Sequence, residues 1–149
     1  MTTIELEPLT EIQEKLIYKP FIEFKVVESV DVLRIQLSDD YTKIDFIVYA
    51  SRFDWVQIQK DTFIRICGSE VKLNLIEAVN ISIAPRKHFF RNRNEFLCYT
   101  LCFPAIPKDT KSIDVIERET EVRSGSYTWF NFYGLSLERI ISERIKVGS

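Results

Sequence analysis

From Phe21 onward, apolar and polar side chains alternate along most of the chain, and this period of two constrains the fold more than any other feature. Ile22 and Phe24 would face one side of an extended segment and the charged residues between and after them the other, as in a half-buried strand. Short strands separated by turn residues are typical of sandwiches and barrels. We therefore predict an all-β fold, a single antiparallel β-sandwich over residues 1–149. Similar segments follow at 33–37, 44–48, 56–58, 63–66, 71–75 and 81–83.

The segment 96–103 differs from the others because it is apolar on both faces. A continuous apolar run is typical of a central strand that is covered on both sides, so we expect Cys98 and Cys102 to be small core residues. Apolar residues make up 46% of the 149 residues, which is enough to bury a core without a metal or a disulfide.

Residues 1–20 do not follow the strand pattern. Thr10 and Gln13 have the spacing of a capping box, which favours the start of a short N-terminal helix. Ile12 and Leu16 would then share one face of that helix. A loosely attached N-terminal segment fits the same residues, and the sequence leaves both alternatives open.

Residues 103–137 carry the most distinctive sequence of the chain. A corner at Phe103-Pro104-Ala105-Ile106-Pro107 leads to Thr110, Asp114, Ile116 and Glu117, then to Trp129 and a final strand with Gly134-Leu135-Ser136-Leu137. This arrangement resembles a segment of poorly characterised bacterial immunoglobulin-like β-sandwich domains. The resemblance implies an immunoglobulin-like sandwich without a known activity, of a kind often found in exported or multidomain proteins. The resemblance assigns no functional role to any residue of this sequence.

The sequence lacks the patterns of the common catalytic and metal sites. His88 is the lone histidine, which leaves a histidine-rich metal site or a serine–histidine–aspartate triad without support. Cys98 and Cys102 would lie about 13 Å apart in a strand, too far for one metal or one disulfide. Asp114 and Glu117, three residues apart, would face opposite sides of a strand and take structural roles. We predict no enzymatic activity, no cofactor and no metal site.

One polar interval combines charge with aromatic side chains. Residues 86–93 hold four fixed positive charges and two adjacent phenylalanines, in a chain whose formal net charge is −2. Such a combination can bind an acidic partner, a phosphate backbone or a base. A solvated loop with one phenylalanine anchored in the core accounts for the same pattern. The candidate binding residues are Arg86, Lys87, His88, Phe89, Phe90, Arg91 and Arg93.

Tryptophans and tyrosines offer a second kind of binding surface. Trp55, Trp129 and Tyr133 would provide stacking faces for sugars or bases if they were exposed. We expect the aromatic run from Trp129 to Tyr133 to lie mainly in the core. The apolar positions change parity beyond Gly134, and a β-bulge there would bring the apolar pairs on either side of it onto one face.

The net charge and the lack of long apolar runs limit the possible partners and cellular locations of the protein. A net charge of −2 disfavours nucleic-acid binding by general electrostatic attraction. No apolar run approaches the roughly 18 residues of a membrane span. The N-terminus lacks the basic and apolar regions of a signal peptide, and three cysteines are an odd count that fits reduced thiols. These features predict a cytoplasmic protein without a membrane span.

These observations favour a non-catalytic protein-binding or structural module, either in a larger assembly or self-associating. The contact would use an exposed sheet edge or the basic residues 86–93. Two alternatives stay open: a sandwich that binds carbohydrate or another ligand through exposed tryptophans, and nucleic-acid binding through the basic loop.

Overall fold

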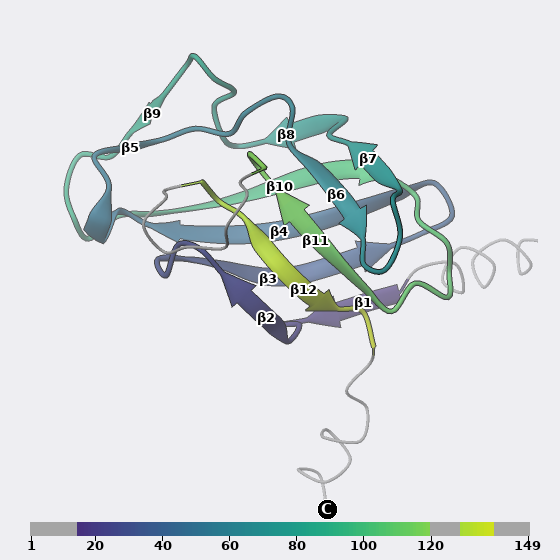
Figure 1. The fold of residues 1–149 in the computed structure, drawn as a ribbon. Coiled ribbons are helices and arrows are strands. Elements are labelled where there is room, and N and C mark those ends of the chain that lie inside the picture. Colours follow the sequence, from purple (N-terminus) through teal and green to yellow (C-terminus); the bar gives the residue numbers. More distant parts are fainter. Residues whose placement is uncertain (1–14, 120–128, 139–149) are drawn as a thin grey trace, which may run out of the picture.

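Two five-stranded antiparallel sheets pack together in the computed structural model, which describes residues 15–119 and 129–138 (Figure 1). The predicted all-β antiparallel sandwich is confirmed. Sheet A contains, in spatial order, β1 (Lys15–Tyr18), β3 (Val30–Leu37), β4 (Tyr41–Tyr49), β10 (Phe96–Pro104) and β8 (Glu77–Val79). Sheet B contains β2 (Ile22–Lys25), β12 (Phe132–Ser136), β11 (Ser112–Ile116), β6 (Phe63–Ile66) and β7 (Lys72–Asn74).

A short ribbon stands apart from both sheets. It pairs β5 (Trp55–Val56) with β9 (His88–Phe89), and a short 3-10 helix, η2 (Ala50–Arg52), connects β4 to it. Figure 1 places this ribbon at the upper left of the sandwich. The basic residues 86–93 therefore belong partly to a strand rather than wholly to a loop.

The core lies between the two sheets, where alternate residues of each strand point inward. Phe46 of β4 stacks on Tyr99 of β10, with 5.0 Å between ring centroids. Phe46 also contacts Phe132 of β12 across the two sheets, with the centroids 5.4 Å apart. All three rings are buried, and burial of such a side chain contributes about 2–3 kcal/mol to folding.

A β-bulge in β12 places its aromatic run in the core. Tyr133 and Gly134 of β12 lie opposite the single residue Asp114 of β11. Gly134 has a φ of +68°, which glycine adopts without the steric cost of a Cβ atom. The predicted bulge is therefore confirmed. The apolar pairs on either side of it are all buried: Phe130, Phe132, Leu135 and Leu137.

The N-terminal prediction is wrong for the residues that the structure describes. Lys15–Tyr18 forms β1 and pairs with β3, so neither a helix that reaches Leu16 nor a loose tail is present there. Ile17 is only 3% exposed, because its side chain packs in the hydrophobic core. Thr10 and Gln13 lie outside the described residues.

The expectation that β10 is covered on both faces is also wrong. Its inward residues are buried, but on the outer face Phe96 is 58% exposed and Cys98 is exposed too. In a two-layer sandwich each sheet has one inward face, and an apolar pattern alone cannot show that the second face lacks a cover. Cys102 is buried as predicted, whereas Cys98 is not a core residue.

Short connections between the sheets close both lateral sides of the sandwich. Residues 19–21 lead from β1 to β2, and residues 75–76 lead from β7 to β8. β8 is thus an edge strand of sheet A. The strand expected at 81–83 is instead an isolated parallel bridge between Ile58 and Ile83.

Candidate functional site

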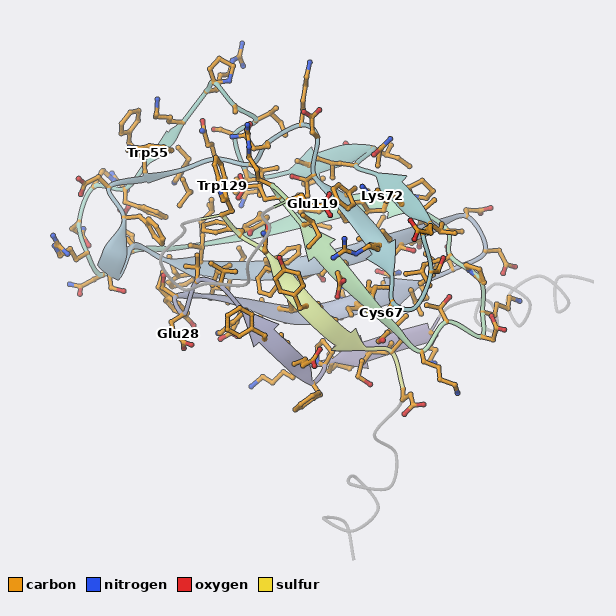
Figure 2. All side chains as sticks on the ribbon, viewed as in Figure 1. Glu28, Trp55, Cys67, Lys72, Glu119 and Trp129 are labelled. Carbon is orange, nitrogen blue, oxygen red and sulfur yellow. The ribbon has the colours of Figure 1, made fainter. Side chains whose placement is uncertain are left out.

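A cavity of about 280 Å³ opens where the segment around β5 approaches the residues that precede β12. Both tryptophans of the chain line it, and we refer to it as the tryptophan pocket. Figure 2 shows Trp55 and Trp129 on the same side of the molecule, near the ribbon and the start of β12. The other lining residues are Phe53, Asp54, Val56, Gln57, Glu117 and Phe130.

The first wall of the pocket depends on the short ribbon. Trp55 lies opposite Phe89 in the β5–β9 pair, and the backbone N–H of Phe90 donates to the carbonyl of Asp54 over 2.9 Å. Val56 is 2% exposed and anchors β5 in the core. Because successive strand residues face opposite sides, Trp55 points outward and remains 39% exposed.

The second wall comes from the residues that enter β12. Phe130 is 5% exposed and packs edge-to-face against Phe53, with ring centroids 5.9 Å apart and an interplanar angle of 71°. A tight turn follows, in which the N–H of Asn131 donates to the carbonyl of Trp129 over 2.8 Å. Trp129 is half-buried, so it presents part of its ring to the cavity.

Glu117 is a buried acidic group in the lining of the pocket, with a relative exposure of 5%. Its Oε1 accepts the N–H of Phe130 over 2.8 Å, and its Oε2 accepts the N–H of Gln59 over 3.2 Å. Burial raises the pKa of Glu117 to about 7, against the opposing effect of these two donors. The carboxyl group therefore joins three separate segments and changes its charge near neutral pH.

Asn131 holds the main chain next to Glu117 in place. Its Oδ1 accepts the N–H groups of Glu117 and Arg118 over 2.8 Å and 3.2 Å, and its Nδ2 donates to the carbonyl of Arg118 over 2.8 Å. Asn131 is 1% exposed, and its bond to the N–H of Glu117 is buried. The amide thus ties the end of β11 to the start of β12 and sets the position of the acidic side chain.

Gln57 supplies a polar atom without a protein partner. Its Oε1 is buried and accepts no hydrogen bond, although the residue lines the pocket. An unpaired buried acceptor is costly, of the order of 1–3 kcal/mol, unless a ligand or water satisfies it. The hydroxyl of Tyr99 is likewise buried and unpartnered, and its burial, together with the charge of Glu117, raises the pKa of Tyr99 well above the usual range.

Two cations lie over the tryptophan rings. Nζ of Lys87 is 4.8 Å from the centroid of the Trp55 ring, and Cζ of Arg118 is 5.2 Å from that of Trp129. Both distances fall within the range of a cation–π interaction, of about 6 Å. Both basic residues are exposed, so they can move aside or contact a bound ligand.

The structure separates the predicted basic residues rather than gathering them. Lys87 reaches the tryptophan pocket, whereas Arg91 pairs with Glu95 at 3.2 Å and Arg93 donates to the carbonyl of Ser51 over 2.9 Å. Arg86 is exposed.

The two phenylalanines of the basic segment also differ from each other. Phe89 is 65% exposed, while Phe90 is half-buried and packs against the core. Phe90 is also in edge contact with His88, with 5.2 Å between ring centroids. The anchored phenylalanine that the sequence allowed is therefore Phe90.

The sequence indicated Trp55 and Trp129 as possible stacking surfaces, but it did not indicate that they share one cavity with Gln57 and Glu117. The structural role predicted for Asp114 and Glu117 agrees with their separate partners: Asp114 binds Arg65, whereas Glu117 binds backbone N–H groups. No local pattern marks Gln57, because its importance comes from a segment that is distant in the chain.

Comparison with known proteins finds no matching family model, curated relative or solved structure. Within residues 15–119 and 129–138, no three histidine, cysteine or carboxylate side chains are grouped so that they could hold a metal ion. The same residues include no helix long and apolar enough to cross a membrane.

Proposed function

We propose that the protein is a non-catalytic binding module that takes a carbohydrate ring in the tryptophan pocket. The observation that carries the proposal is a cavity that both tryptophans line, together with Gln57, whose Oε1 is buried without a hydrogen-bond partner. The proposal favours ligand binding over the contact through the basic segment, because Arg91 and Arg93 are already bonded within the chain.

The walls of the pocket support a ligand with a flat apolar face. Trp55 and Trp129 offer aromatic surface, and the C–H side of a sugar ring stacks on such surfaces. The cavity, of about 280 Å³, is slightly smaller than the range for drug-sized ligand sites, about 300–1,000 Å³. That volume favours a single ring or the end of a chain over a large ligand.

The polar groups support a ligand that donates hydrogen bonds. Asp54 adds an exposed carboxylate to the lining, and Gln57 holds a buried, unpaired Oε1 that a sugar hydroxyl would reach once this side chain turns into the cavity. Sugar hydroxyls would donate to these oxygens, while Lys87 and Arg118 at the rings would donate to other hydroxyls. A purely apolar ligand would leave the Gln57 acceptor unpaired.

The non-catalytic part of the proposal rests on Glu117. Both of its oxygens accept backbone N–H groups, so the carboxyl group is committed to holding three segments together. A glycosidase needs two carboxyl groups placed on either side of the scissile bond. Asp54 is the other carboxylate of the lining, and it belongs to the exposed rim.

Intrinsic fluorescence provides a direct test, because the chain contains two tryptophans and both line the pocket. A panel of mono- and oligosaccharides would be titrated into the full-length protein. We expect a saturable change in tryptophan emission with at least one sugar. Gln57→Ala should weaken that binding about 2- to 13-fold, the effect of losing one hydrogen bond worth about 0.5–1.5 kcal/mol.

Matched controls separate the pocket from the rest of the surface. Gln36→Ala removes a glutamine from sheet A, and Phe96→Ala removes an exposed aromatic residue outside the pocket, so both should leave sugar affinity unchanged. Isothermal titration calorimetry with Trp129→Ala provides a readout that does not depend on fluorescence. The proposal fails if no sugar in the panel binds, or if binding survives both Gln57→Ala and Trp129→Ala.

The membership of the chain among bacterial immunoglobulin-like domains stays a prediction that rests on residues 103–137. A sandwich of two antiparallel sheets is compatible with it. Nucleic-acid binding has less support, because two of the four cations in the basic segment are bonded within the chain and one lies over Trp55.

A further inference from the structure

The outer face of sheet A, on the side away from sheet B, exposes several large apolar side chains. Phe96, Tyr18, Val79 and Tyr49 are 58%, 55%, 45% and 44% exposed. The rings of Tyr49 and Phe96 contact each other, with 6.2 Å between centroids. In Figure 1 sheet B lies in front of sheet A, so this face points away from the viewer. Tyr49 and Phe96 thus form one exposed apolar patch, while Tyr18 and Val79 lie on the two edge strands of the same face. Exposed apolar patches mark interaction sites.

A row of cross-strand partners crosses the middle of this face. From β1 to β8 the row is Tyr18, Arg34, Asp45, Thr100 and Val79. Nε of Arg34 lies 2.8 Å from Oδ2 of Asp45, and Oδ1 of Asp45 accepts the hydroxyl of Thr100 over 2.6 Å. One positive and one negative charge thus stand side by side, with an apolar side chain at each end of the row.

The face is hollowed over this row. A cavity of about 410 Å³ is lined by Leu33, Arg34, Asp45 and Asn80, among others. Leu33 is the extra residue of a bulge between Val32 and Arg34 in the β3–β4 pair. The depression gives a partner room for side chains beside the central charges.

We propose that this face binds a second copy of the chain, sheet A against sheet A, about a two-fold axis parallel to the strands between β3 and β4. In such an arrangement Arg34 of each copy lies opposite Asp45 of the other, and Tyr18 lies opposite Thr100. A uniformly acidic or basic partner would instead leave one of the two central charges facing a like charge. The charge pattern therefore favours a second copy over a partner of one sign.

The strands that the axis brings together set the size of the contact. It places β1, β3, β4 and β10 of one copy over β10, β4, β3 and β1 of the other, and these strands have 4, 8, 9 and 9 residues. At about 3.3 Å per residue and about 4.8 Å between strands, their flat area is on the order of 500 Å². Typical stable interfaces bury about 800 Å² on each partner, so we expect a small interface and a dimer that dissociates on dilution.

The test reverses one of the two central charges, Arg34 or Asp45, in each of two variants. Arg34→Asp gives a copy with two acidic residues in the row, and Asp45→Arg gives a copy with two basic ones. Sedimentation velocity over a wide concentration range should show a wild-type dimer and two monomeric single variants. An equal mixture of the two variants should form a heterodimer, because both contacts between copies become complementary although the pair within each chain stays broken.

A matched pair of aromatic variants locates the contact. Tyr18→Glu lies at the end of the central row, opposite Thr100 of the other copy, and should raise the dimer dissociation constant by at least about 30-fold, as loss of an interface hot spot does. Phe89→Glu changes a comparably exposed phenylalanine on the β9 ribbon and should leave dimerisation unchanged. Circular dichroism of each variant confirms that it is folded.

Several results would overturn the proposal. A wild-type protein that stays monomeric at every concentration would do so, as would a dimer that Tyr18→Glu leaves intact. Failure of the two folded charge variants to associate when mixed would exclude the proposed axis. Cross-linking from Cys98 to residues 1–14 of the same chain, in a monomer, would identify that segment as the occupant of the face instead.

Discussion

The backbone N–H of Gly134 donates to Oδ1 of Asp114 over 2.8 Å, and this bond closes the bulge of β12 against β11. The same carboxylate accepts two bonds from Arg65 through Oδ2, both of 3.1 Å, and one from the thiol of Cys67. A carboxylate held by four donors fixes the register of two strands. That register in turn directs Phe132 into the core, two residues after Phe130 of the tryptophan pocket.

Gly134→Ala should destabilise the protein by about 2–3 kcal/mol. A residue with a Cβ atom is strained at a φ of +68°, at a cost of about 1–2 kcal/mol, and this Cβ would lie 2.7 Å from Cβ of Glu23. Gly68→Ala is the control, because Gly68 also has a positive φ, of +81°, but faces open space. Urea unfolding of both variants measures the difference. Equal losses of stability would contradict the steric argument.

Asn131→Ala should cost about 3 kcal/mol and alter the tryptophan pocket. The change leaves the buried N–H of Glu117 without its acceptor, and such an unpaired group costs about 1–3 kcal/mol besides the other bonds lost. Asn92→Ala, on an exposed turn, should cost little. Chemical denaturation gives the stabilities, and the emission wavelength of the tryptophans reports the pocket. Unchanged emission in a destabilised Asn131→Ala protein would show that this amide does not position the site.

Glu117 should make the folded protein less stable as the pH rises from about 4.5 to about 7. Its pKa is about 7 in the folded protein against a usual value of 4.5, so the folded state holds the proton more tightly within that window. The free energy of unfolding then falls with rising pH, by up to about 3 kcal/mol from this group, and levels off above 7.

Glu117→Gln isolates this effect because its side chain stays neutral throughout. Other carboxyl groups titrate in both proteins, so the difference between the wild type and the variant reports Glu117 alone. We expect that difference to shift in favour of the variant when urea unfolding is repeated at about pH 8 rather than about pH 5. Parallel stability curves would mean that Glu117 titrates normally in the folded state.

Cys98 should react with a thiol reagent faster than the other two cysteines in dilute protein. It is exposed, whereas Cys102 is buried and burial raises the pKa of its thiol. Cys67 is half-buried, and its pKa is raised chiefly by burial as well. Mass spectrometry after timed labelling would identify the modified residue, with Cys98→Ser as the control. Labelling of Cys98 should also slow at high protein concentration if sheet A pairs with a second copy.

Much of the fold could be predicted because a half-buried strand requires apolar and polar residues to alternate in the sequence. The alternation in residues 44–48 marks the buried face of β4, and the parity change at Gly134 marks the bulge. Two errors share one cause. β1 and the outer face of β10 depend on which neighbours cover them, and a local pattern does not contain that information.

By itself the sequence determined the class of fold, the inward face of most strands and the identity of the two tryptophans, since the period of side chains along a strand follows from backbone geometry alone. Only the tertiary structure decided that Trp55, Gln57, Glu117 and Trp129 line one cavity. The pairing of β11 with β12 places Glu117 near Trp129, and the bond from the N–H of Gln59 to Glu117 brings the segment after β5 to them. Their proximity is a product of long-range packing, which no window of the sequence displays.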